Sequence, residues 1–298
     1  NWVAFAAVSA TDEDSAQAVT AVVPIAEALL SLDRTQIEEF VAEDLRQHNP
    51  MLEDGRQGLL TLTEGGEMPR GGGDNLMAGT AHVVVDGPLV LIHRLGQLGP
   101  LDSVNFDLLE INQQGQLAEH WTYVQPVEAG LMDNLLFSFV VPRQLDLIPT
   151  RQPVDFDLTG DLPEYGLPVA RDAAQVELNK LRVLGYLEAL SQEDNSQGIA
   201  SFLHPDFLLR QPGLTAGREA WIQRLAKARR RPEAPQVERV VAQNDLVWVL
   251  SRVPHILLQD VPELASADLF RVREGVIVEQ WRVVQPSPRF SRNENGLF

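Results

Sequence analysis

Asp107 is a residue whose place in the sequence suits acid–base chemistry. It lies in a stretch with strand-like alternation, where it shares one face with Leu109 and Ile111. A carboxyl group on an apolar face tends to have a raised pKa, which suits a general acid or a general base. The alternative is that Asp107 begins its strand and is solvated at the rim. Asp268 occupies the same place in a second stretch of this kind.

Histidines supply the other titratable candidates. His93 alternates with leucines at positions 89, 91 and 95. A lone histidine on an apolar face is more often a satisfied core residue than a catalyst, so both interpretations stay open. His48, His82, His93 and His120 could in principle bind a metal, but neither HxH nor HExxH spacing is present. We therefore expect no metal. A phosphate-binding glycine loop after a strand is likewise absent from the sequence.

These candidates belong to a tandem repeat. DLLEINQQGQLAEHWTYVQP, at positions 107–126, returns as DLFRVREGVIVEQWRVVQP at 268–286, with Trp121 and Trp281 160 positions apart. A second pair of stretches, 46–56 and 208–218, repeats in the same order and aligns Arg56 with Arg218. Each copy spans roughly 110 residues, which is the size of a domain rather than of a solenoid repeat.

The same order of elements is predicted in both copies. In the first, apolar spacing indicates a helix from Ser15, which Pro24 should kink or restart, and a second helix with a capping box from Thr35, a buried stripe through Leu45 and an end at Pro50. A glycine-rich loop at 64–73 follows, then strands at 82–85, 89–95, 103–111 and 117–124. In the second copy we expect helices at 173–190, 195–203 and 218–229 and strands at 237–242, 246–253, 267–272 and 276–284.

Helices followed by an antiparallel meander predict an α+β fold. We expect two cone-shaped α+β barrels in tandem, each with N-terminal helices packed on a curved antiparallel sheet whose open end can hold a small molecule. The predicted division is a first domain at 15–126, a proline-rich linker packed on the domains at 127–172, and a second domain at 173–287. Below, "first copy" and "second copy" denote 15–126 and 173–287.

Composition narrows the range of partners. The formal net charge of −18 opposes binding to a phosphate backbone, so we expect no nucleic acid. The absence of cysteine excludes disulfides and thiolate catalysis.

No apolar run approaches the length of a membrane span, which predicts a soluble chain. The first ten residues resemble the tail of a signal peptide or an ordinary N-terminal element, so the compartment, cytoplasmic or periplasmic, stays open.

The motifs as a set resemble the SnoaL-like polyketide cyclase family, within the nuclear transport factor and ketosteroid isomerase superfamily. The resemblance covers both copies and is carried by the stretches 48–50, 54–56, 89–93 and 115–126 together with Asp107. It implies a cofactor-free acid–base enzyme, of the cyclase, isomerase or lyase type, acting on a hydrophobic carbonyl compound. It also implies that the copies pack through their sheets as a pseudo-dimer, in a chain that is a monomer or a homodimer.

The resemblance also suggests roles. Asp107 would be the base and His48, His93 or His120 the proton partner or oxyanion donor, with Arg56 as an anion anchor or a surface salt-bridge residue. Further ligand-binding candidates are Trp121, Asp268 and Trp281. Family members often carry an acid where this chain has Thr122 and Arg282, and the second copy replaces the three histidines by Arg210, Leu250 and Gln280. We therefore expect the first copy to be the active one. The alternative function is a non-catalytic ligand-binding or dimerisation protein of the same fold.

Overall fold

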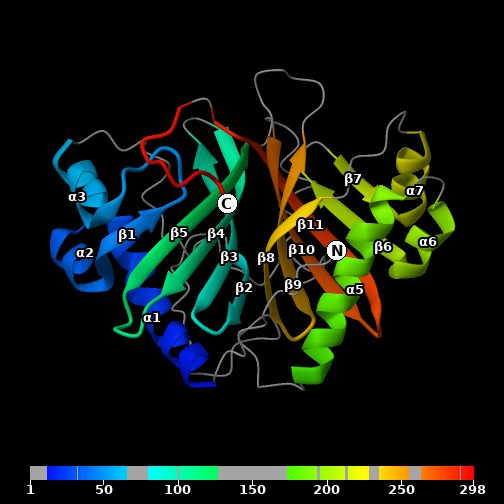
Figure 1. The fold of residues 1–298 in the computed structure, drawn as a ribbon, viewed down its shortest axis with the longest axis horizontal. Helices are drawn as coiled ribbons and strands as arrows, with labels where there is room; N and C mark the ends of the chain where they lie inside the picture. Colours follow the sequence, from blue (N-terminus) through cyan, green and yellow to red (C-terminus); the bar gives the residue numbers. More distant parts are fainter. Residues whose placement is uncertain are drawn as a thin grey trace, which may run out of the picture.

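The chain folds into two mixed β-sheets, each preceded by helices, as predicted for an α+β protein (Figure 1). The computed structural model describes residues 12–31, 33–65, 80–98, 101–126, 173–192, 195–211, 214–227, 235–254, 263–288 and 290–298. The glycine-rich residues 66–73, the linker 127–172 and the N-terminal ten residues, on which predictions were made, lie outside the described residues.

The first sheet has five strands in the order β1-β5-β4-β3-β2. Strand β1 pairs parallel with β5, and the other neighbours are antiparallel. The predicted antiparallel meander is therefore confirmed for β2 to β5, and β1 makes the sheet mixed. The elements are α1 (Asp12–Ser31), α2 (Arg34–Phe40), β1 (Val41–Gln47), α3 (Gly55–Gly65), β2 (Thr80–Asp86), β3 (Leu89–Leu98), β4 (Leu101–Ile111) and β5 (Leu117–Pro126).

The second sheet has six strands in the order β7-β6-β11-β10-β9-β8. Here β6 pairs parallel with β11, as β1 does with β5, and β7 adds an antiparallel edge strand. The elements are α5 (Ala173–Ser191), α6 (Ser196–Phe202), β6 (Leu203–Gln211), β7 (Leu214–Gly217), α7 (Arg218–Lys227), β8 (Gln236–Gln243), β9 (Leu246–Pro254), β10 (Glu263–Arg273) and β11 (Val276–Pro286).

The second predicted helix of the first copy is too long. Helix α2 ends at Phe40, and β1 begins at Val41, although the apolar spacing suggested a helix through Leu45. Val41 and Leu45 are both buried, but they contact the core from a strand that pairs with β5. Parallel pairing with a distant strand is a tertiary effect that local periodicity does not report. In the second copy, the helix predicted at 195–203 is confirmed as α6, and β6 follows it directly.

Two local details of the helices differ from the prediction. Helix α1 does not restart at Pro24, because it continues from Asp12 to Ser31 with the proline inside it. The N-cap of α2 is Asp33, whose carboxylate accepts a hydrogen bond from the Gln36 amide at 3.0 Å, in place of the capping box predicted from Thr35.

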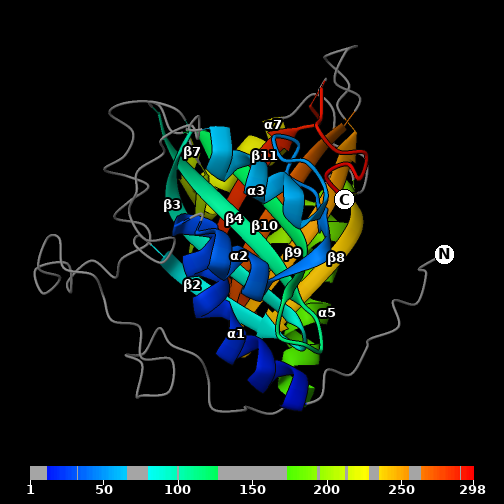
Figure 2. The same ribbon diagram turned by 90° about the vertical axis from the view of Figure 1, so that its left-hand side faces the viewer.

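The protein is layered as helices, sheet, sheet, helices (Figures 1 and 2). One apolar cluster joins α1, α2 and α3 to one face of the first sheet, and a second does the same for α5, α6, α7 and the second sheet. A third cluster lies between the sheets and takes side chains from both copies, among them Phe106, Trp121, Trp248 and Trp281. Every strand thus has a helix-facing side and an intersheet side, and this alternation decides where each candidate residue points.

Reciprocal hydrogen bonds connect the two sheets. Gln125 accepts from the Val284 amide at 2.9 Å, and Gln285 accepts from the Val124 amide at 2.8 Å. An equivalent pair of bonds joins Asp86 to Ala242 and Gln243 to Val85. Such reciprocity is what a two-fold symmetric interface produces. The two sheets therefore pack on each other, and the repeated Gln-Pro motif is part of their interface.

Among the described helices, none combines the length and the apolar character needed to span a lipid bilayer.

Candidate functional site

Asp107 lies on the helix-facing side of the first sheet. Its neighbours on that face of β4, Leu109 and Ile111, belong to the cluster under the helices, as the alternation predicted. The carboxylate is buried, and its Oδ2 accepts a hydrogen bond from Arg94 Nε at 2.6 Å. Oδ1 lies 3.7 Å from Nε2 of His120. Asp107 is therefore not a solvated rim residue but part of a buried polar group.

The expected rise in the pKa of Asp107 is wrong. Burial raises the pKa of this carboxyl, but the guanidinium of Arg94 and the imidazole of His120, when it is protonated, outweigh burial and lower the pKa to about 2. The group is therefore an ionised carboxylate at any ordinary working pH. Its chemistry is to hold and compensate a positive charge rather than to deliver a proton.

His120 is the titratable group next to Asp107. It is buried on β5, with Nδ1 3.2 Å from Gln47 Oε1 and Nε2 3.1 Å from Thr122 Oγ1. Because the amide oxygen of Gln47 only accepts, this contact requires a proton on Nδ1. In the neutral ring, Nε2 is then the free base, and it is the nitrogen that lies beside Asp107.

Gln47 completes this group and was missed by the sequence analysis. It is the last residue of β1, it is fully buried, and its Nε2 finds no hydrogen-bond partner within the described part of the chain. A buried amide N–H without an acceptor is costly in a folded protein, and such groups often indicate a bound ligand or water. The aligned residue in the second copy is Leu209. Comparison of the two copies could therefore have singled out Gln47, because a polar residue stands in one copy where an apolar residue stands in the other.

His93 does not meet Asp107, because it lies on the intersheet side of β3. Its ring stacks on Phe106 with centroids 4.3 Å apart, and its Nδ1 is 3.1 Å from Nδ1 of His82. His82 in turn contacts Arg271 and Trp281 of the second copy. His93 is therefore a buried core histidine. Because its side chain lies between the sheets, it does not contact Asp107 or His120, which are on the other face of the first sheet.

These buried histidines predict a loss of stability in mild acid. Burial, followed by the charges of Arg271 and Arg210, lowers the pKa of His82 from 6.5 to about 3. Because the unfolded chain binds the proton first, stability falls as pH drops from about 6.5 toward 3, by about 1.4 kcal/mol per pH unit for one histidine. Asp107 acts in the same direction only at lower pH, as pH falls through about 2.

Denaturant unfolding at pH 7, 6, 5 and 4 measures this slope. We expect His82→Gln to flatten it, while His204→Gln, at a side chain that is 42% exposed, leaves it unchanged. Equal slopes in the wild type and the His82 variant would contradict the assignment.

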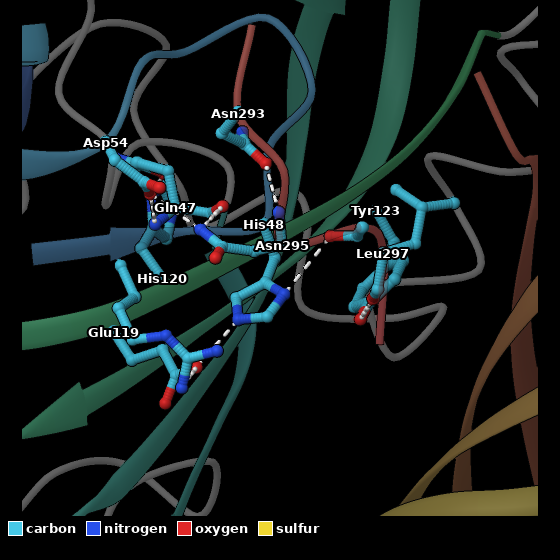
Figure 3. A network of polar contacts seen from close by, with 11 residues as sticks. Gln47, His48, Asp54, Glu119, His120, Tyr123, Asn293, Asn295 and Leu297 are labelled. Carbon is cyan, nitrogen blue, oxygen red and sulfur yellow. Dashed lines mark hydrogen bonds and ion pairs between the residues drawn. The ribbon is translucent and has the colours of Figure 1, made fainter. Parts of the chain in front are cut away.

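His48 lies at the edge of the intersheet side, beyond the end of β1. Its ring stacks on Trp121 with centroids 4.6 Å apart, Nε2 is 2.7 Å from Glu119 Oε1, and Nδ1 is 3.1 Å from the Gly296 carbonyl oxygen (Figure 3). Burial lowers its pKa despite the opposing effect of Glu119. Trp121 and Trp281 both lie in the core between the sheets, which places their rings on the side opposite to the Asp107 group.

Arg56 holds the backbone where a helix changes into a strand. Its Nε donates to the Val41 carbonyl at 2.7 Å, at the junction of α2 and β1. Arg218, its partner in the repeat, donates to the Ala200 carbonyl at 3.1 Å, near the junction of α6 and β6. Each arginine of the repeated Gly-Arg motif thus donates to a backbone carbonyl at or near a junction of helix and strand, which gives the motif a structural contact in both copies.

The second copy builds a closed version of the same group. Asp268 accepts from Arg282 Nε at 2.6 Å, from Gln280 Nε2 at 2.7 Å and from Ser266 Oγ at 2.7 Å. The amide of Gln280, which occupies the position of His120, therefore contacts the carboxylate directly. Both carboxylate oxygens of Asp268 thus accept hydrogen bonds from the protein itself.

The arginine that pairs with the aspartate comes from a different strand in each copy. Arg94 is on β3 and aligns with Ser251, whereas Arg282 is on β11 and aligns with Thr122. Each thus reaches the aspartate of β4 or β10 from the opposite neighbouring strand. In the second copy, the position at which the resemblance led us to expect an acid is occupied by Arg282, which pairs with the buried Asp268.

No group of three or more histidine, aspartate or glutamate side chains is arranged to hold a metal ion within the residues that the structure describes.

Comparison with known proteins gives matches to solved structures alone. No protein-family model and no curated protein matches the sequence. A candidate SnoaL-like polyketide cyclase from Jannaschia sp. CCS1 is 21% identical and covers 39% of this chain and 91% of its own, with a TM-score of 0.33. IdmH, a candidate polyketide cyclase from Streptomyces antibioticus, is 24% identical over 36% of this chain and 91% of its own, with a TM-score of 0.30. An LEH-like epoxide hydrolase from M. tuberculosis is 17% identical over 37% and 85%, with a TM-score of 0.33. Each of these three matches covers a little over a third of this chain.

Proposed function

We propose that this chain is a tandem SnoaL-like protein whose first copy is a cofactor-independent acid–base enzyme of the cyclase, isomerase or lyase type. Its substrate would be a hydrophobic small molecule that carries a ketone. We place the domain boundaries as predicted, at 15–126 and 173–287 with the linker between them. The observation that carries the proposal is the unpartnered Nε2 of Gln47 beside the His120 and Asp107 pair.

The three side chains divide the work of removing a proton next to a carbonyl. The unprotonated Nε2 of His120, which lies 3.1 Å from the Thr122 hydroxyl, takes a proton from the carbon adjacent to the carbonyl, and the electron pair of that C–H bond moves to form an enolate. The Gln47 Nε2–H donates to the enolate oxygen, the place where negative charge develops. The ionised Asp107, held by Arg94, stabilises the imidazolium that forms. His120 then returns the proton to carbon, in an isomerisation, or to the new alkoxide after an aldol closure.

This proposal changes the role first given to Asp107. With its pKa near 2, the carboxylate is a weak base, so the proposal assigns the proton transfer to the adjacent imidazole of His120. His93 and the two tryptophans take no part, because they lie on the other side of the sheet.

The alternative is a ligand-binding or dimerisation protein without catalysis. The observation in its favour is the second copy, where Asp268 is fully hydrogen-bonded to Arg282, Gln280 and Ser266. In that copy Leu209 and Gln280 replace Gln47 and His120, so the aspartate is retained without a proton partner. The large core between the sheets suits an assembly role equally well.

The chain itself suggests the variants that test the proposal. Gln47→Leu and His120→Gln convert two positions of the first copy into the residues of the second. We expect aromatic ketones to raise the Tm of the wild type more than their hydrocarbon analogues do. In Gln47→Leu, the preference for the ketone should fall by about tenfold in Kd, the value of one hydrogen bond to a buried group.

The His120 variant separates catalysis from binding. We expect His120→Gln to keep ketone binding and to lose exchange of the protons adjacent to the carbonyl with solvent deuterium, measured by NMR. Equal exchange in wild type and variant would remove the catalytic assignment, and ketone binding without exchange in the wild type would support the non-catalytic alternative.

A further inference from the structure

The C-terminal segment of the chain, residues 290–298, lies on the first copy although it follows the last strand of the second. It lies beside the loop between β1 and α3, where Asn293 and Asn295 are close to Gln47 and Asp54 (Figure 3). The Arg292 amide donates to the Pro50 carbonyl at 2.9 Å. Asn293 Nδ2 donates to the carbonyls of Asn49 and Leu52 at 2.8 and 2.9 Å. This segment, here called the C-terminal strap, therefore donates hydrogen bonds to backbone carbonyl groups of the first copy.

The strap reaches the strand end that carries Gln47. Asn295 Nδ2 donates both to the Gln47 carbonyl, at 2.9 Å, and to Asp54 Oδ1, at 2.6 Å. The same Asp54 oxygen accepts the Gln47 amide at 2.9 Å. Asn295 thus closes a ring of hydrogen bonds around the backbone of Gln47, and the side chain of that residue carries the unpartnered amide of the site.

The strap supplies what an extra strand supplies in the second copy. There, Leu209, the counterpart of Gln47, pairs with Ala216 in β7, so β6 is covered by a neighbour. By the repeat alignment, the first-copy segment that corresponds to β7 is 52–55, which is not a strand. Strand β1 is therefore at the edge of the first sheet, with no neighbouring strand on its outer side. An uncovered strand end leaves backbone groups unpaired and mobile. In the first copy those groups are bonded by Asn295 and Asp54 instead.

We infer that the C-terminal strap is a positioning element for the first-copy site, with Asn295 fixing Gln47 in place of a missing edge strand. The strap follows the second copy in the sequence. The second copy, which lacks the counterpart of His120, therefore still contributes to the function of the first copy. Further contacts anchor it: Tyr123 donates to the Leu297 carbonyl at 2.6 Å, and Leu297 is buried between the sheets. The consequence for ligand binding rests on the proposed function, whereas the ordering of Gln47 does not.

The full-length variant Asn295→Ala tests this inference, with Glu294→Ala, an exposed neighbour in the same segment, as the matched control. We expect Asn295→Ala to speed hydrogen exchange of the Gln47 amide by about tenfold, because one hydrogen bond that orders its acceptor is lost. The ¹⁵N signal of His120 Nδ1, which contacts the Gln47 side chain, should shift. The control should change neither.

The outcomes of this test are distinct. Unchanged Gln47 exchange and an unchanged His120 signal in Asn295→Ala overturn the inference, because the strap would then be ordering nothing at the site. If both change and the aromatic ketones bind about tenfold more weakly to the variant than to Glu294→Ala, the strap positions a functional site. If both change and no ketone binds even to the wild type, the inference stands and the proposed function fails.

Discussion

Asp107→Asn is expected to reduce turnover of a ketone substrate by about 10²- to 10⁴-fold. The carboxylate compensates the positive charge that His120 acquires when it takes a proton, and a neutral amide cannot do so. Steady-state kinetics on a ketone identified by the binding screen measures the loss, which should appear in kcat rather than in KM because it arises in the transition state.

The second copy provides the control for this substitution. Asp268→Asn removes the same charge from the equivalent strand position, beside an equally close arginine. Both variants should therefore lose stability, but only Asp107→Asn should lose turnover. Equal losses of turnover would show that both copies are active, and no loss from Asp107→Asn would remove this residue from the mechanism.

Arg282→Met should lower the free energy of unfolding by about 3–5 kcal/mol, because it leaves the buried carboxylate of Asp268 without its counter-charge. Burial lowers the pKa of Arg282, but the negative charge of Asp268 raises it by more than burial lowers it. The Arg282 side chain therefore stays charged in the folded protein. Denaturant unfolding at neutral pH measures the change. The retained hydrogen bonds from Gln280 and Ser266 keep the expected loss at the lower end of this range.

Two comparisons separate this effect from a general loss of charge. Arg273→Met removes an arginine that is 63% exposed and pairs with Asp245, so it should cost no more than about 1 kcal/mol. The double variant Asp268→Asn with Arg282→Met should recover most of the loss, since no unpaired buried charge remains. A double variant as unstable as Arg282→Met alone would show that the arginine acts through packing on Trp221 rather than through its charge.

Sequence periodicity predicted the parts of the fold that are decided locally. The predicted strands correspond to β2 to β5 and β8 to β11, because runs of strand-forming residues can be recognised from neighbouring positions alone. Gly87 and Gly115, in the turns that follow β2 and β4, have positive φ angles of 59° and 77°. The repeat predicted that the copies share this plan. By contrast, β1 and β6 pair parallel with strands about 70 residues later, which no local pattern records.

The sequence also determined which residues could exchange a proton, but not which face of the sheet each would occupy relative to the others. Alternation placed Asp107 with Leu109 and His93 with Leu91, and both placements hold. Only the sheet packing decided that the first face is covered by helices and the second by the other copy, which separates His93 from Asp107. Gln47 and Asn295 are joined by a contact across 248 positions. Their roles arise because chain segments far apart in sequence satisfy one another's backbone groups.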